Sequence, residues 1–522
     1  MKENKLGKHT NSFMKNVIIL MCSEILVKVL GMIYKLVITN MEGFGNTGAG
    51  YYASGYQIYA LLLTLSSIGI PSVISKLVSE RLAIGDKTGA QRIFKIALKF
   101  FATLGLIFSI LLYFGAEFIA NNILNVPDTV YVMRVLAPAI VFVSISAVLK
   151  GYFAGQQNMK PTSVAQTLEQ FLNCVLSITF VYACIGKDAY IMAAAGNLST
   201  TLAIMITFVY LINYYKRNKL EINPEQRSPE RRKSNKELLR TILGISIPIT
   251  ISSIISVISS VIDTATVSNC IQYAYQNSGM TKEALETLAM TKAGILSKID
   301  TLVTFPLASP ILKMIYPSAS DGALILQLSS ISMIFTALNQ TVNGGLYGLN
   351  LPKVPVAALG VGVVAKTILN IILVSNPTIN IAGASIGSIV CQILAFLIAF
   401  RVLNMKLKIK FDPKKNIIKP AIAAVVMGII VYFVQYLLNM FMGNILSTLL
   451  AIIVGVGVYG LAIIFMNVLS KEDILMIPFG SKVYPILVKI GIYKEDCYAE
   501  ESRYSSNNKY MENTQPLNIA EI

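Results

Sequence analysis

The sequence is poor in the residues that carry most enzymatic and metal-binding chemistry. Its one histidine, His9, lies in the N-terminal tail, which excludes a catalytic histidine or a His-based metal site in the apolar part of the chain. The six cysteines form no CxxC pair, so we expect apolar fillers and neither a zinc knuckle nor a redox pair. The sequence lacks a P-loop motif, so ATP does not drive it directly. We therefore expect no enzyme, no metal and no cofactor.

Charged residues are also scarce. They make up 14% of the chain, and hydrophobic residues make up 54%, whereas about 25% of residues are charged in a typical soluble domain. A soluble core cannot bury this much apolar surface, so lipid must be the solvent. The first apolar run follows a basic start, as in a signal peptide. It is too long for one and is interrupted by Glu24 and Lys28, so we expect a retained first helix.

The apolar runs predict an all-α polytopic membrane protein. A run of about 20 residues crosses the ~30 Å hydrocarbon core. Twelve such spans are predicted, at 14–38, 51–74, 93–115, 130–150, 163–184, 190–213, 241–262, 323–346, 355–375, 381–403, 418–440 and 444–468.

The net charge of +17 is gathered in alternate loops. Basic residues cluster at 76–95, 214–240 and 401–419, while the intervening loops hold few. Basic loops stay in the cytoplasm, so the charge sets orientation and does not indicate nucleic acid. The sequence predicts a multi-pass protein of a bacterial inner membrane with the N-terminus, loop 214–240 and the C-terminus in the cytoplasm.

A thirteenth apolar segment, 293–316, does not fit this pattern. If it crossed the membrane, the basic loop 401–419 would lie outside, against the charge rule. The segment also carries Asp300 and two prolines, Pro306 and Pro310, which weaken a spanning helix. We expect it to start and end on the outer side, as a re-entrant segment or a shortened helix pair.

The two halves of the chain look related. Residues 150–164 and 343–356 are both Gly-rich helix ends followed by Asn, Pro and a new span, and such duplication is common in transporters. The predicted organisation is an N-terminal lobe (1–213), a basic linker (214–240), a C-terminal lobe (241–403) truncated around 304–312, two extra helices (404–470), and an amphipathic segment with a polar tail (471–522).

Four residues of the first span, Glu24, Lys28, Gly31 and Lys35, fall on one helical stripe. A charge at the bilayer centre costs roughly 3 kcal/mol, so these charges must face a cavity or one another. Two interpretations stay open. Glu24 and Lys28 form a neutral pair while Lys35 reaches the interface, or the stripe is the basic wall of a hydrated cavity that attracts an anion.

Other polar residues within the spans are candidates for the same cavity, each with a structural alternative. Lys366, with Asn370 one turn on, needs a partner elsewhere or a hydrated cavity. Interface snorkelling is the alternative for Arg134, helix capping for Glu169 and Gln170, an interfacial boundary for Asp263, and helix–helix hydrogen bonding for Gln340 and Asn343.

Six strings carry a family resemblance: KVLGMIYK (28–35), GIPSVISKLVSE (69–80), GYFAGQQNMKPTSVAQTLEQ (151–170), IDTATV (262–267), SKIDTLVTFPLA (297–308) and AKTILN (365–370). With them the chain resembles the stage V sporulation protein B family. That family belongs to the polysaccharide-flippase branch of the MOP superfamily, beside MurJ-type lipid II flippases and MATE antiporters. The resemblance implies a V-shaped pair of six-helix lobes with two extra C-terminal helices. It also implies alternating access to a central cationic cavity.

The basic residues of KVLGMIYK match positions where MurJ-type flippases carry cavity arginines, so the resemblance gives Lys28 and Lys35 that role. Other positions depart from the pattern. Thr301 and Thr304 stand where it has a basic and an acidic residue, and Asn173 stands where relatives often have a basic one. TFPLASPIL (304–312) joins two motifs that the family separates by a helix–loop–helix of about 50 residues.

The sequence therefore predicts a flippase for a lipid-linked anionic oligosaccharide, lipid II or a related peptidoglycan or spore-cortex precursor. Lys28, Lys35 and Lys366 would bind the diphosphate while the polyprenyl tail stays in lipid. A MATE-like cation antiporter is one alternative, and it would require an acidic cavity. A non-transporting scaffold that contacts the cell-wall or sporulation machinery is the other.

The predicted topology is tested by reporter fusions placed after Lys419. We expect a cytoplasmic signal there, because residues 401–419 are basic. A fusion in loop 214–240 serves as the cytoplasmic control. A periplasmic signal after Lys419 would mean that 293–316 spans the membrane.

Overall fold

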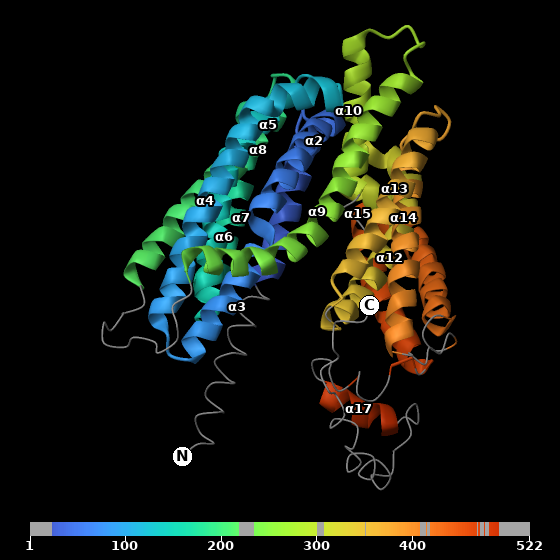
Figure 1. Cartoon of the computed structure of the whole chain (residues 1–522). Helices are drawn as coiled ribbons and strands as arrows, with labels where there is room; N and C mark the ends of the chain where they lie inside the picture. Colours follow the sequence, from blue (N-terminus) through green and yellow to red (C-terminus); the bar gives the residue numbers. More distant parts are fainter. Residues whose placement is uncertain are drawn as a thin grey trace. The chain divides into compact units, whose positions relative to one another are not determined.

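The structure is a computed structural model, and every regular element it describes is a helix (Figure 1). The chain divides into two compact units, Met1–Ile409 and Lys410–Ile522. Each unit is considered by itself. The described residues are 23–218, 234–299, 307–349, 351–407, 414, 418–466, 468–469, 474 and 480–489.

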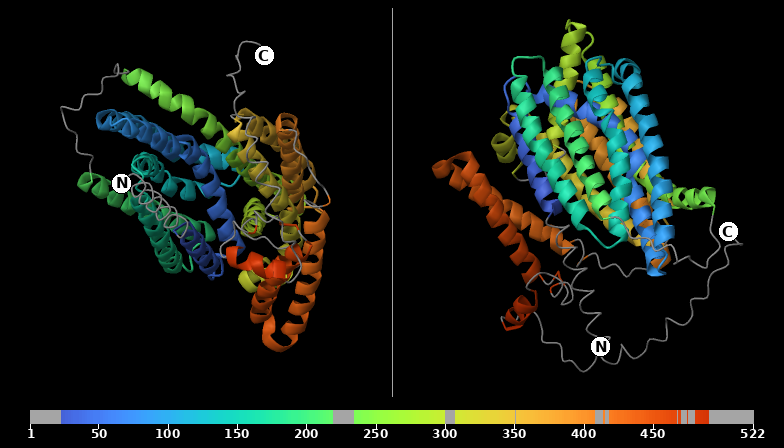
Figure 2. Two further views of the ribbon diagram at one scale, coloured as in Figure 1. Left: turned by 90° about the horizontal axis from the view of Figure 1, so that it is seen from below. Right: turned by 90° about the vertical axis from the view of Figure 1, so that its left-hand side faces the viewer.

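The first group of helices in the larger unit begins with a helix over residues 23–39. The helices that follow are α2 (Gly45–Leu63), α3 (Ile70–Ala83), α4 (Lys87–Phe118), α5 (Thr129–Leu136), α6 (Ala139–Gly155), α7 (Lys160–Ala183) and α8 (Ala189–Arg217). The side chain of Asp86 caps α4 by accepting a hydrogen bond of 2.7 Å from Gly89 N. Helix α7 packs on α8, and α6 packs on α3, α4 and α8, so the blue to green helices lie side by side in Figure 2.

Helix α9 (Asn235–Ala274) starts at a capping box formed by Ser234 and Glu237. Near its start, Leu238 and Ile242 are buried in the same apolar cluster as residues of α3, α4 and α6. Its second half packs on α13 (Lys353–Val374) and α10 (Lys282–Ile299) and also keeps a contact with the first group, where Ser268 Oγ donates to Leu124 O at 2.6 Å. Figure 1 shows α9 passing from the first group of helices to the second. This one helix therefore belongs to both groups.

The second group in the larger unit consists of α10, α11 (Ala308–Ile315), a 3-10 turn (Pro317–Gly322), α12 (Ala323–Gly348), α13 and α14 (Ala382–Leu407). Helix α14 packs on both α12 and α13. Helices α13 and α14 approach closely at a small residue, since a Cβ added to Gly362 would lie 2.5 Å from the carbonyl oxygen of Cys391.

The segment that the sequence predicts to be shortened forms two short helices. Helix α10 follows the turn after α9, and α11 is only eight residues long. At the end of α11, Ile315 O accepts a hydrogen bond of 2.9 Å from Asn40 Nδ2, in the turn that precedes α2. Thr47, at the start of α2, in turn contacts Thr291 of α10. Thr291 and Ile315 thus both contact residues at the start of α2 or in the turn before it, and the location of the segment on the outer side stays a prediction. Asp300 lies outside the described residues.

Ten helices of the described part are long and apolar enough to cross a membrane, and α10 is not one of them. They include α15 (Lys419–Phe465) in the second unit, which contains two of the predicted spans. Gly443 has a φ of 74° inside α15 and breaks it into a hairpin, whose ends are joined by a hydrogen bond of 2.7 Å from Lys419 Nζ to Met466 O. The first predicted span begins outside the described residues. Helix α17 (Gly480–Lys489) follows in the amphipathic segment.

The closest contact between the two groups is a backbone-to-backbone crossing of α2 and α10. A Cβ atom added to Gly294 would overlap the carbonyl oxygen of Asn46, and one added to Gly50 would overlap that of Met290. Only glycine allows this approach on both helices.

We therefore expect Gly294→Ala to lower the free energy of unfolding by about 1–3 kcal/mol, because neither backbone can move away without breaking helix hydrogen bonds. Gly360→Ala on α13 is the matched control, since its Cβ would meet open space and should be neutral or stabilising by up to ~1 kcal/mol. Thermal unfolding in detergent, followed by circular dichroism, measures both. Equal melting temperatures would contradict the crossing.

Candidate functional site

A buried ion pair joins α9 to α13. Lys366 on α13 is 4% exposed. Its Nζ donates to Asp263 Oδ2 on α9 at 2.5 Å and to Ser259 Oγ at 3.0 Å. The other carboxylate oxygen, Oδ1, accepts a hydrogen bond of 2.8 Å from Asn370 Nδ2, one turn from Lys366. Asn370 Nδ2 also lies 3.2 Å from Thr266 Oγ1. Both oxygens of Asp263 are thus held by donors from one face of α13.

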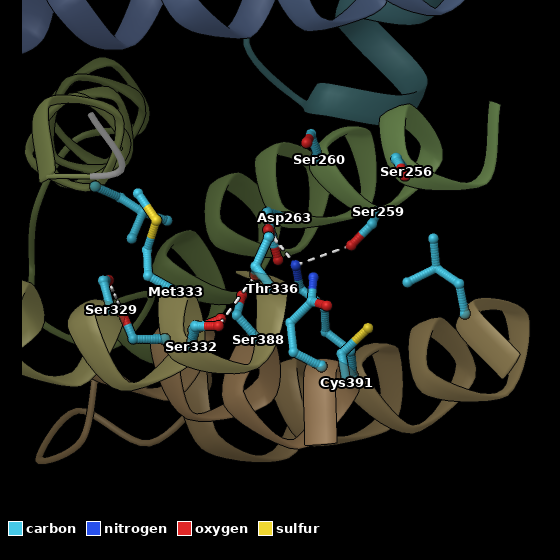
Figure 3. Close-up of a pocket in the computed structure, with 15 residues that line it drawn as sticks. Ser256, Ser259, Ser260, Asp263, Ser329, Ser332, Met333, Thr336, Ser388 and Cys391 are labelled. Carbon is cyan, nitrogen blue, oxygen red and sulfur yellow. Dashed lines mark hydrogen bonds and ion pairs between the residues drawn. The ribbon is translucent and has the colours of Figure 1, made fainter. Parts of the chain in front are cut away.

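The pair faces a polar cavity of about 240 Å³. Figure 3 shows Asp263 and Ser259 on one wall, Thr336 on a second and Cys391 on a third. Seven serines line the cavity, namely Ser256, Ser259, Ser260, Ser329, Ser332, Ser385 and Ser388. Hydroxyl groups donate and accept hydrogen bonds in any direction, so the cavity is suited to water and to mobile charge inside a membrane helix bundle.

This geometry corrects the assignment of Lys366 to phosphate binding. The sequence predicts that Lys366 needs a partner outside its own segment, and that partner is Asp263. A buried ammonium paired with a carboxylate offers no net positive charge to an anion. Asp263 does not stand at the end of its helix, as the predicted span 241–262 implied, because α9 continues to Ala274 and Asp263 lines the cavity. Asn370 belongs to the same helix–helix contact.

The stripe on the first helix lies along the edge of its packed face. Glu24 and Lys28 are exposed, and Glu24 Oε1 accepts a hydrogen bond of 3.1 Å from Gln166 Nε2 on α7. A Cβ added to Gly31 would lie 3.3 Å from Gln170 Nε2, so Gln170 packs directly on the stripe. Lys35 is half-buried at the other end. These contacts place the stripe beside the polar side chains of α7.

Glu169 extends this polar surface, and its predicted capping role is wrong. Helix α7 begins at Lys160, so Glu169 lies in the middle of the helix and not in its first turn. Its carboxylate lies 3.7 Å from Lys150 Nζ on α6. The register was misjudged because the apolar run starts later than the helix, whose first turns are polar.

Arg134 lies apart from the stripe, in a contact between α5 and α4. Its Nη2 is 3.2 Å from Glu117 Oε2, and its guanidinium lies 5.9 Å from the ring centre of Tyr113. Both partners are on α4, and both charged side chains are well exposed. This arrangement matches a surface ion pair and gives Arg134 no place in a cavity with Lys28 or Lys35.

Gln340 and Asn343 line a second polar cavity of about 150 Å³ between α9, α12, α13 and α14. Neighbouring Asn339, which the sequence did not single out, donates from Nδ2 to Gln392 O at 3.0 Å and to Gln392 Oε1 at 2.9 Å. Both predicted alternatives, a polar cavity and helix–helix hydrogen bonding, are thus present within one turn of α12.

Lys298 is a buried basic residue that was not among the predicted site residues. It is 3% exposed, and its Nζ donates to Asn46 Oδ1 at 2.7 Å and lies 5.4 Å from the centre of the Tyr316 ring. Lys298 and Lys35 line the same small cavity between the first helix, α2 and α10. The signal that was available is a lysine in an apolar segment that is not predicted to span.

Residues 13–312 match the sequence profile of a family described as polysaccharide biosynthesis protein. The chain belongs to this family. Among curated relatives of this polysaccharide biosynthesis protein, stage V sporulation protein B of Bacillus subtilis is 25% identical over 434 residues, which cover 73% of this chain and 82% of the relative. Lipid II flippase MurJ of the same organism is 28% identical over 216 residues, 40% of this chain and 39% of that protein.

Solved structures share its fold. Lipid II flippase MurJ in an inward closed conformation has a TM-score of 0.59 at 16% identity, over 85% of this chain and 98% of that chain. An inward-facing multidrug resistance MATE transporter of the MOP superfamily has a TM-score of 0.55 at 15% identity, over 74% of this chain and 96% of that chain. The chain therefore has the same fold as these two transporters.

Removing one member of the buried pair should destabilise the protein more than removing both. Lys366→Met leaves the Asp263 carboxylate buried without its cation, and we expect a loss of about 3–5 kcal/mol. Adding Asp263→Asn should restore most of that loss. Glu117→Gln, at the exposed pair, should cost no more than ~1 kcal/mol. Detergent-solubilised variants compared by thermal unfolding give these values, and additive effects of the two substitutions would argue against a direct pair.

Proposed function

We propose that this chain is a flippase that moves a lipid-linked anionic oligosaccharide across a membrane by alternating access. The cargo we propose is lipid II or a related peptidoglycan or spore-cortex precursor. The relatives support this proposal, because one is a lipid II flippase and another is a stage V sporulation protein. The MOP superfamily fold supports transport but does not distinguish between cargoes.

The observation that carries the proposal is that the first helix has a basic edge beside an exposed apolar face. Lys28 and Lys35 follow one edge of this helix, and the neighbouring face presents exposed apolar side chains such as Ile25, Val29 and Met32. A lipid-linked diphosphate has the same division, with an anionic head and a hydrocarbon tail. Lysine binds phosphate as a compact point charge, and the apolar face can remain in contact with lipid and the tail.

The polar neighbours of this edge suit a sugar head group. Gln166 and Gln170 on α7 flank Glu24 and Gly31, and amide side chains both donate to and accept from hydroxyl groups. Sugar recognition would then come from α7, and phosphate recognition from the first helix.

A MATE-like antiporter for cationic drugs is less well supported. Such cargo needs unpaired carboxylates in its cavity, but Asp263 is neutralised by Lys366 and Glu169 lies beside Lys150. The other alternative is a scaffold that does not transport, and the experiment must distinguish it from a flippase because helices α10 and α11 are short.

The test is a flipping assay in proteoliposomes with fluorescent lipid II and a lipid with a neutral head group. We expect wild-type protein to move lipid II and not the neutral lipid. Lys28→Ala with Lys35→Ala should reduce the rate about tenfold or more, because two charge-assisted contacts of ~1.5 kcal/mol or more are removed.

The control is Lys187→Ala, an exposed lysine in the turn before α8, which should flip at the wild-type rate. Arginine at positions 28 and 35 should restore most of the activity. Unchanged flipping by the double alanine variant would refute the basic edge as the binding site, and a wild-type chain without flipping activity would favour the scaffold.

A further inference from the structure

Helix α12 has a continuous polar face. Six polar residues recur along it at helical spacing between positions 329 and 343, which is about 21 Å of helix. They are Ser329, Ser332, Thr336, Asn339, Gln340 and Asn343. Each of them lines the cavity of about 240 Å³, the cavity of about 150 Å³, or both. Figure 3 shows the first part of this face turned toward the serines of α9. The polar face of α12 is therefore directed into the helix bundle.

The two cavities adjoin, since Ser256, Thr336 and Gln392 line both of them. We call the larger one the serine cavity, after the seven serines that line it. The smaller one is the amide cavity. It has the amides of Asn339, Gln340, Asn343 and Gln392 on one side, and apolar side chains on the other, namely Pro355, Ala358, Leu359 and Ala395. One continuous space thus combines hydroxyl groups, amide groups and an apolar wall.

This space carries no net charge. Among the described residues that line the amide cavity, none has a titratable side chain. In the serine cavity the charges of Lys366 and Asp263 compensate each other, and the remaining titratable group is the thiol of Cys391. The cavities therefore favour a neutral ligand over an anion or a cation.

Asn343 offers the amide cavity an unused acceptor. Within the described part of the chain, its Oδ1 is buried and accepts no hydrogen bond, whereas neighbouring Asn339 donates to Gln392. A buried polar atom without a partner costs free energy, and a ligand with an N–H or O–H group would remove that cost. Ser256 and Gln340 are exposed, so the amide cavity opens at its edge and a ligand can enter.

The lining of the amide cavity matches an acetamido group. Such a group has one methyl, one N–H and one carbonyl oxygen. The methyl can pack on Ala358 and Leu359, the N–H can donate to Asn343 Oδ1, and the carbonyl can accept from the amide of Gln340. Water also fits a polar cavity, but it has no methyl group to place against the apolar wall.

We propose that the serine cavity and the amide cavity together bind a neutral N-acetylated sugar. The acetamido group occupies the amide cavity, and the ring hydroxyls bond to the serines of α9, α12 and α14. The inference deepens the proposed function and rests on it for the source of the sugar, which is the head group of the lipid-linked oligosaccharide. The site lies in the second group of helices, whereas Gln166 and Gln170 belong to the first. Both groups would therefore contact the head group.

The site is tested with free N-acetylglucosamine and the purified full-length protein, in a detergent that has no sugar group. Saturation-transfer NMR reports which ligand protons touch the protein. We expect the acetyl methyl protons to receive saturation, with a Kd of about 1 mM because one sugar is a small ligand. Asn343→Leu should raise the Kd about tenfold or more, since a site built to bond a ligand N–H discriminates strongly once that bond is lost.

Two further variants control this result. Asn122→Leu makes the same change at an exposed asparagine at the end of α4, and it should bind as the wild type does. Gln340→Leu alters an exposed side chain of the site, so it should keep the wild-type melting temperature and still weaken binding. Wild-type binding by Asn343→Leu and Gln340→Leu overturns the proposal.

Two probes test the chemistry of the ligand. Glucose has the hydroxyl groups without the amide, and N-methylacetamide has the amide without the hydroxyl groups. Each should bind at least about fivefold more weakly than N-acetylglucosamine. Equal binding of either probe overturns the proposal. So does the absence of saturable binding at about 100 times the expected Kd, which would mean that the cavities hold water only.

Flipping of lipid II, measured on the same preparation, separates this site from the proposed function. A protein that binds the sugar and does not move lipid II retains the site, while the proposed function fails. A protein that moves lipid II without binding the sugar refutes the site alone.

Discussion

A charge removed from water must be compensated within the protein, and this constraint shapes every polar feature of the larger unit. Lys366 meets it with Asp263, Lys150 with Glu169, and Lys298 with Asn46 and the Tyr316 ring. Each of these polar contacts joins two segments of the chain. Hydrophobic packing alone would not hold them in register, because lipid solvates an apolar helix face as well as another helix does. The buried charges thus determine which helices pack against each other, and the apolar residues determine that the segments form membrane helices.

The compensated charges divide into two kinds. Those of α9 and α13 are enclosed and neutral as a pair. Those on the first helix lie at an exposed edge, where Lys28 is accessible and Glu24 is satisfied by a glutamine. Lysine therefore has two different roles in this structure. An enclosed lysine holds helices together, and an exposed one is available to a ligand.

The sequence predicted what depends on local composition. Run length predicted the membrane helices, and Asp300 with two prolines argued against a spanning helix over 293–316, where the structure has the end of α10 and the short helix α11. It could not predict partners, because Lys366 and Asp263 are 103 positions apart and nothing in either segment indicates the other. The register of Glu169 failed for another reason. Helix α7 begins at Lys160, before the predicted span 163–184, and Ser23 of the first helix donates a hydrogen bond to Ser163 O in these first turns.

The crossing of α2 and α10 places main chain against main chain at Gly50 and Gly294. Side-chain contacts can adapt by changing rotamers, but a contact between two backbones has no such freedom. The spacing of α2 and α10 at this point is therefore set by the main chain alone, and any rearrangement that separates the two helices here gives up the contact as a whole.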